Sequence, residues 1–190
     1  MAYLGLLLFH LVFFRRFYFQ NPYVYFTSEP ADTAFPSLRL LGRRGPDDPY
    51  YYPDFRSIPF LQSYYPPTRV LAWLTKSWPL NAAFVAYSAM MAGHYYMASC
   101  ACYWLLSGGH STGMALFGAV TLSHLGYAVK QNACINCTVA WLPVLLLAAA
   151  QQNVELCGIS LGMSLLAGYW PLALYCIPLA GLVWLWPSAW

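Results

Sequence analysis

The stretch that decides the fold class runs from residue 79 to residue 106 and reads PLNAAFVAYSAMMAGHYYMASCACYWLL. It contains no Asp, Glu, Lys or Arg, and it begins with proline, whose missing N–H is not needed in the first turn of a helix. An uncharged run of this length exceeds the roughly 20 residues that a helix needs to cross a bilayer. The stretch therefore predicts a transmembrane helix that is tilted in the lipid.

The composition of the whole chain points the same way. Of its 190 residues, 60% are hydrophobic and 8% are charged, whereas soluble domains have about 25% charged residues. Residues 77–190 carry only Lys130 and Glu155 as charged side chains, too few to give several helices polar outer faces. We therefore predict an all-α polytopic membrane protein whose localisation is the membrane itself and whose first partner is the lipid bilayer.

Three regions follow from the distribution of apolar residues, prolines and charges. Residues 1–26 are predicted to hold the first transmembrane helix. Residues 27–76, rich in proline and tyrosine, form a long surface loop or cap, because proline disfavours regular helix. Residues 77–190 form the helical bundle, with turns near 107–111 and 151–155. Residues 156–190 are either two short helices or one kinked helix, so we expect four to six transmembrane helices in all.

The loop after the first helix holds the acidic residues that could carry chemistry. Glu29 and Asp32 lie three residues apart, and Asp47 and Asp48 are adjacent between two prolines. Either pair could bind a divalent cation, or could supply a general base for a substrate hydroxyl. The alternative is that these carboxylates form solvated ion pairs with arginines of the same loop, which contribute little to stability.

The same loop carries arginines and tyrosines that suggest a phosphate site. Arg39, Arg43 and Arg44 could bind a phosphate through bidentate contacts, and Tyr64 and Tyr65 could line the same site. Attraction of the arginines to anionic lipid headgroups is the alternative. The net charge of +3, with basic and acidic residues interleaved, argues against nucleic-acid binding.

Histidines and cysteines inside the apolar stretches give a weaker signal. His94 and His124 lie within predicted transmembrane helices, where ionisable residues mark candidate functional sites. Cys134 and Cys137 form a single Cys-x-x-Cys motif, for which zinc binding would need further ligands. For both pairs the alternative is structural: the histidines form hydrogen bonds between helices and the cysteines pack as small apolar residues.

Several short motifs resemble the YfhO-like bacterial membrane proteins of the type C glycosyltransferase superfamily. They are Tyr-Tyr-Pro-Pro at 64–67, Leu-Asn-Ala-Ala-Phe at 80–84, Ala-Trp-Leu-Pro at 140–143 and Leu-Ala-Gly-Tyr at 166–169. The resemblance implies a membrane glycosyltransferase of the bacterial inner membrane, present as a fragment or reduced homologue, that transfers a sugar from a polyprenyl-phosphate donor. It also implies that Asp32, with Glu29 beside it, is the catalytic base, with Asp47 and Asp48 as second choice, and that the arginines hold the donor phosphate.

A second class of function fits the same sequence. In it the chain is a non-catalytic structural subunit of a membrane protein complex, and the loop rich in tyrosine and arginine is a docking surface for other membrane subunits, since these residues are common at interfaces. A small transporter is a third class, but it would need more polar residues inside the helices than His94 and His124 provide.

Overall fold

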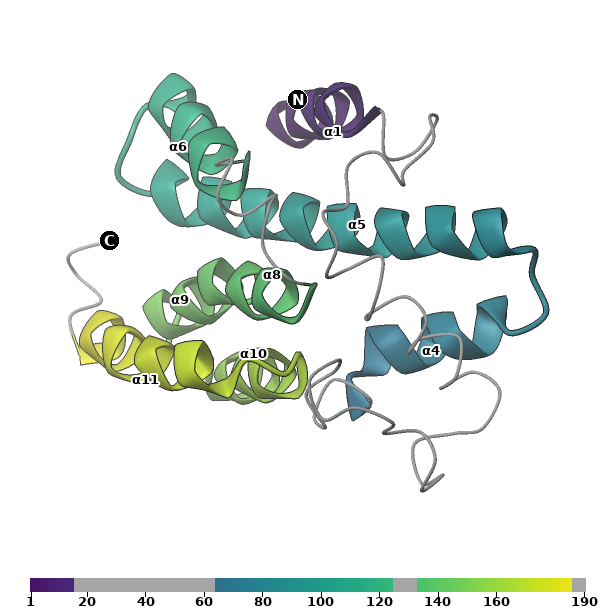
Figure 1. The fold of residues 1–190 in the computed structure, drawn as a ribbon. Helices are drawn as coiled ribbons and strands as arrows, with labels where there is room; N and C mark the ends of the chain where they lie inside the picture. Colours follow the sequence, from purple (N-terminus) through teal and green to yellow (C-terminus); the bar gives the residue numbers. More distant parts are fainter. Residues whose placement is uncertain (16–63, 125–132, 186–190) are drawn as a thin grey trace.

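The computed structural model describes residues 1–15, 64–124 and 133–185, which form helices and no strand (Figure 1). The longest helix, α5 (Leu80–Ser107), runs through the middle of the fold. On one side lie α1 (Ala2–Phe13) and α6 (Thr112–His124). The helices on the other side are α4 (Pro66–Thr75), α8 (Ala133–Ala140), α9 (Leu142–Ala150), α10 (Val154–Leu166) and α11 (Trp170–Leu185).

The prediction of a polytopic membrane protein is wrong. Within the described ranges, no helix combines the length and the apolar character that crossing a membrane requires. α5 has 28 residues, but Asn81, His94 and several tyrosines lower its mean hydropathy. α11 is the next longest at 16 residues, below the roughly 20 residues of a spanning helix. The predicted integral membrane localisation is contradicted by the same finding.

Within the predicted helical bundle, residues 133–150 form two helices, α8 and α9, which are separated at Trp141. Pro143 lies in the first turn of α9, where it cannot donate the backbone hydrogen bond that a continuous helix would need. The N–H of Trp141 instead donates to the carbonyl of Thr138 at 3.2 Å, and the N–H of Leu145 donates to the carbonyl of Trp141 at 2.9 Å. The α-helical hydrogen-bond pattern is therefore interrupted at Trp141.

For residues 156–190 the sequence allowed either two helices or one kinked helix. The described part of this segment forms two helices, α10 and α11. Gly168 separates them with φ of 107°, a conformation that side chains with a Cβ rarely adopt. The turn is fixed to α8 by two hydrogen bonds of the Thr138 side chain. Its hydroxyl donates to the Ser164 carbonyl, and its Oγ1 accepts from the Tyr169 N–H, both at 3.3 Å. α10 and α11 are thus held against α8 at their junction.

Two clusters of buried side chains hold the helices together. The larger joins α4, α5, α8 and the α10–α11 junction, and consists of Tyr65, Ala72, Ala83, Phe84, Tyr87, Met91, Cys137 and Ala167. The smaller joins α1, α5 and α6 through Leu6, Cys102 and Ala119. Alanine recurs in both, so the helix axes can approach closely. α5 contributes to both clusters and is the element that connects the two sides of the fold.

Close packing of α6 on α5 gives the first testable prediction. A Cβ at Gly118 would lie 2.5 Å from Cδ1 of Leu106, whereas a Cβ at Gly93 meets nothing within 4 Å. Gly118→Val should therefore lower the free energy of unfolding by about 1 kcal/mol through overpacking, since the end of the flexible Leu106 side chain can partly move aside, while Gly93→Val should change it little. Denaturant unfolding of both variants measures the difference. Equal stabilities would show that α6 does not pack on Leu106 as described.

Candidate functional site

The predicted catalytic and phosphate-binding residues lie outside the described residues. This applies to the carboxylates Glu29, Asp32, Asp47 and Asp48 and to the arginines Arg39, Arg43 and Arg44. The divalent cation and the polyprenyl-phosphate donor that were assigned to these side chains therefore stay predictions. Of the predicted site, the structure describes Tyr64 and Tyr65, which directly precede α4.

Tyr65 is the centre of a buried polar cluster. Its side chain is 0% exposed, and its hydroxyl is hydrogen-bonded to Nε2 of His94 on α5. The indole Nε1–H of Trp141 donates to the same hydroxyl oxygen at 2.8 Å. Three segments that are far apart in the sequence, the start of α4, the middle of α5 and the α8–α9 junction, therefore meet at one oxygen atom.

The direction of each hydrogen bond follows from which atoms can donate a proton and which can only accept one. Nδ1 of His94 lies 2.7 Å from the carbonyl oxygen of Met90, which can only accept. Nδ1 therefore carries the proton, and Nε2 is left as the acceptor. The Tyr65 hydroxyl donates to Nε2, which leaves its oxygen free to accept from Trp141. The result is one directed chain from the indole through the phenol and the imidazole to a backbone carbonyl.

Local sequence explains why the cluster forms at these places. Tyr65 is the N-cap residue of α4, with extended backbone angles, and Pro66 and Pro67 follow it in the first turn. Proline restricts the residue before it to extended conformations, which sets the direction of the Tyr65 side chain relative to α4. Trp141 lies at the break that Pro143 causes. Two of the three members are thus positioned by prolines.

Burial keeps the titratable members of the cluster neutral. The pKa of His94 is lowered because burial penalises the imidazolium, and the hydrogen bond to Met90 opposes this only in part. The pKa of the Tyr65 phenol is raised, chiefly by burial and further by the nearby Cys137 thiol, against the effect of the Trp141 hydrogen bond. Both side chains are uncharged at neutral pH, which agrees with the directed chain of hydrogen bonds.

This arrangement is suited to holding helices together. Both nitrogens of His94 are engaged, so neither is available to coordinate a metal ion. No group of three or more His, Cys, Asp and Glu side chains that could hold a metal ion occurs among the residues that the structure describes. Cys137 of the predicted Cys-x-x-Cys motif is buried in the larger cluster, with its thiol 3.7 Å from the sulfur of Met91. Its observed environment is that of a core residue.

Sequence reasoning singled out Tyr65 and His94 separately and missed that they are partners. His94 was considered as a functional site or as a residue that forms hydrogen bonds between helices, and the structure has it in the second role. Trp141 entered only as part of a short motif. Its one local signal was a tryptophan two residues before a proline, which suggests a helix break but not a hydrogen-bond partner 76 residues away.

Removing the Tyr65 hydroxyl tests the structural role of the cluster. Tyr65→Phe keeps the ring but leaves the Trp141 indole and His94 Nε2 without a partner, which should cost about 1–3 kcal/mol in the free energy of unfolding. Tyr96→Phe is the matched control, because its hydroxyl donates to the Tyr3 carbonyl at 3.3 Å in an exposed position. Its effect should stay within about 0.5 kcal/mol. Similar losses in both variants would contradict the proposed importance of the buried cluster.

The lowered pKa of His94 predicts a pH dependence of stability. Its ordinary value is 6.5, and the value in the folded state is lower, so the unfolded chain binds the proton more tightly. The stability contribution of neutral His94 is therefore complete above about pH 6.5 and is lost as pH falls from there through the folded-state pKa. Since other histidines titrate in this range, the measurement is the difference in thermal stability between wild type and His94→Gln. A difference that does not vary between pH 8 and pH 5 would refute this assignment.

Comparison of the chain with protein-family models, with curated proteins and with solved structures finds no match in any of the three. The resemblance to YfhO-like proteins and to the type C glycosyltransferase superfamily therefore stays a prediction from short motifs.

Proposed function

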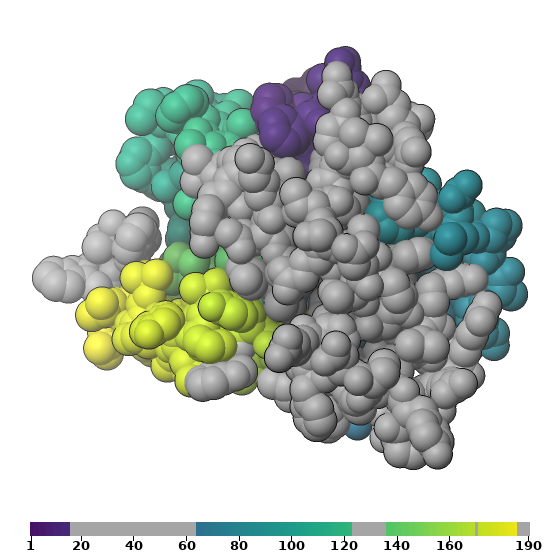
Figure 2. Space-filling model, viewed as in Figure 1, coloured from purple at the N-terminus to yellow at the C-terminus, as the bar shows by residue number. Residues whose placement is uncertain are grey.

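We propose that the chain is a non-catalytic subunit that binds partner proteins through exposed apolar faces of its helices. The observation that carries the proposal is the outer surface of α11. Tyr175, Leu179 and Leu182 follow one another at helical spacing on one face and are 75%, 43% and 66% exposed. Figure 2 shows α11, in yellow, as part of the molecular surface.

A second exposed apolar surface lies on α4. Val70, Trp73 and Leu74 are all exposed, with Trp73 at 65%. Nζ of Lys76 lies 6.0 Å from the centre of the Trp73 ring, at the outer limit of a cation–π contact. Tryptophan is enriched among the residues that carry most of the binding energy at protein interfaces. This surface therefore has the composition of a docking site.

The scarcity of charge on the described helices supports the same proposal. In the ranges 1–15, 64–124 and 133–185 the charged side chains are Arg15, Arg69, Lys76 and Glu155. Proteins that act as monomers rarely expose large continuous apolar surfaces, because water contact is unfavourable and aggregation follows. Cores of protein interfaces are depleted in charged residues. Partner chains that cover α11 and α4 would remove both surfaces from water.

The buried polar groups also favour a structural role. Tyr65 and His94 are engaged with Trp141 and Met90, and these bonds join helices. The competing glycosyltransferase hypothesis depends on Asp32 and its neighbouring acids, outside the described residues. No observation on the described helices favours it.

Site-specific photocrosslinking tests the proposal in cells that produce the protein. A photoreactive phenylalanine analogue at Leu182 or at Trp73 should yield covalent adducts of discrete higher mass that contain a second polypeptide. The same analogue at Gln151, an exposed residue in the turn between α9 and α10, should yield none. Adding Tyr175→Glu to the Leu182 variant should reduce its adduct at least tenfold, because an uncompensated charge at a desolvated interface weakens binding.

The other outcomes of this experiment each reject the proposal in its present form. An adduct of twice the mass of the chain, containing only its own peptides, would identify a homo-oligomer. Adducts to lipid alone would identify a lipid surface as the partner. Adducts of equal yield at Gln151 would mean that the labelling is unspecific.

A further inference from the structure

Tyr65 is the main anchor of α4, because the rest of the buried face of this helix consists of small side chains. Thr68, Ala72 and Thr75 follow Tyr65 at helical spacing and are buried with it, and Leu71 is partly buried beside them. α4 lies beside the first half of α5 and is joined to it by a short turn (Figure 1). Small side chains bury little apolar surface, so they hold α4 only weakly.

The buried face of α4 also contains a polar atom without a partner. Oγ1 of Thr68 is buried and has no hydrogen bond to any residue that the structure describes. Burial of such an atom is unfavourable, and Thr68 would regain its hydration if α4 moved away from α5. His94 and Trp141, by contrast, belong to helices that are also packed on one another near Met91 and Cys137. Of the elements that meet at Tyr65, α4 is therefore the one that can separate most readily.

The hydrogen bonds of Tyr65 require a neutral His94. Nε2 accepts from the phenol, and Nδ1 already donates to the carbonyl of Met90. A proton that binds Nε2 turns this atom into a second donor toward the Tyr65 oxygen, beside the indole of Trp141. The phenolic hydrogen then has no acceptor in the cluster, and a positive charge is buried with it. Both changes disfavour the docked position of Tyr65.

The surroundings of His94 offer no carboxylate for an imidazolium within the described ranges. The titratable side chains of the surrounding cluster are Tyr65 at the start of α4, Tyr87 and Tyr95 on α5 and Cys137 on α8. On α1, His10 is also buried. None of these groups carries a negative charge at acidic pH. The charged side chains of the described helices are all exposed: Arg15, Arg69, Lys76 and Glu155.

We propose that His94 is a proton-sensitive latch, whose protonation at Nε2 releases Tyr65 and α4 from α5 while the other described helices stay packed. The released phenol and the Thr68 hydroxyl then bind water, and the Cys137 side of the larger cluster loses its cover. The latch acts through the interior of the fold, so it needs no partner protein on the exposed surface of α4.

The pH range of the latch follows from linkage. Burial holds the pKa of His94 below its ordinary value of 6.5 while α4 is docked, and release of α4 brings the side chain back toward that value. The released state therefore binds the proton more tightly. Each pH unit below about 6.5 should raise the ratio of released to docked molecules about tenfold, until the docked-state pKa is reached.

Thiol labelling of the wild-type protein separates release of α4 from unfolding of the whole chain. Cys137 is buried in the larger cluster with Tyr65, whereas Cys102 is buried in the smaller cluster between α1, α5 and α6. The reagent is 4,4′-dithiodipyridine, which reacts with thiols in mildly acidic solution, and the labelled peptides are quantified by mass spectrometry. From pH 8 to pH 5, the labelling rate of Cys137 relative to that of Cys102 should rise about tenfold or more.

Two histidine variants test whether His94 is the group that responds. His94→Gln keeps an oxygen that can accept from Tyr65 but cannot take up a proton in this range, so the relative rate should no longer depend on pH. His110→Gln is the matched control, because His110 is exposed beyond the end of α5. It should keep the rise seen in the wild type.

Amide hydrogen exchange of the wild type gives a second measurement that needs no variant. After correction for the intrinsic effect of pH, amides of α4 should lose protection between pH 8 and pH 5, and amides of α9 should keep it. Equal loss in α4 and α9, or no loss in α4, would overturn the proposal. So would parallel labelling of Cys137 and Cys102, or a rise that persists in His94→Gln. If that variant is unfolded at pH 8, the exchange of the wild type decides.

Discussion

The fold depends on one constraint: the hydroxyl of Tyr65 is buried and must be satisfied from two sides. Trp141 donates to it and His94 accepts from it, so the start of α4 and the α8–α9 junction are fixed to the middle of α5. A buried polar group without a partner costs about 1–3 kcal/mol, which penalises arrangements of these helices that separate the three side chains. The apolar cluster around Tyr65 includes alanines and tyrosines, which can pack in many ways. The hydrogen bonds of Tyr65 with His94 and Trp141 select one of these packing arrangements.

Two turns between helices were predicted from the sequence, because they have local causes. The turn before Thr112 and the turn at 151–155 appear at the predicted places, whereas the sequence left open whether residues 156–190 form one helix or two, and it did not predict the break at Trp141. The membrane prediction failed for a different reason. Counting alanine, tyrosine and cysteine as hydrophobic gave a strongly apolar composition, yet these residues contribute much less hydropathy than leucine or isoleucine. α5 has the length of a spanning helix but is rich in such residues.

The buried cluster could not be predicted from the sequence, although each of its members was visible there. Tyr65 and His94 are 29 residues apart, and Tyr65 and Trp141 are 76 residues apart. No periodic pattern relates such positions, and only the packing of α4 and α8 on α5 brings them together. The sequence assigned Tyr65 to a substrate site because it stands beside the loop of carboxylates and arginines. In the described structure its side chain is buried, and its hydroxyl is hydrogen-bonded to His94 and Trp141.

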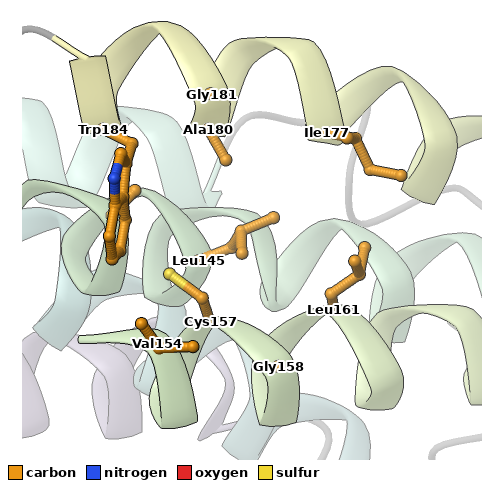
Figure 3. Close-up of a pocket in the computed structure, with 10 residues that line it drawn as sticks. Leu145, Val154, Cys157, Gly158, Leu161, Ile177, Ala180, Gly181 and Trp184 are labelled. Carbon is orange, nitrogen blue, oxygen red and sulfur yellow. The ribbon is translucent and has the colours of Figure 1, made fainter. Parts of the chain in front are cut away.

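Small residues account for both the close packing of the interior and the groove between α10 and α11 at the surface (Figure 3). Where the space opposite a glycine is occupied, as at Gly118 against Leu106, the absence of a side chain lets two helices approach closely. Where glycine and alanine face one another, as at Gly158 and Ala180, neither helix fills the space between them. A glycine therefore gives either a close helix contact or an unfilled space, depending on which side chains of the neighbouring helix lie opposite it. The register of α10 against α11 therefore leaves a groove at the surface, whereas the register of α4, α5 and α8 produces the packed interior.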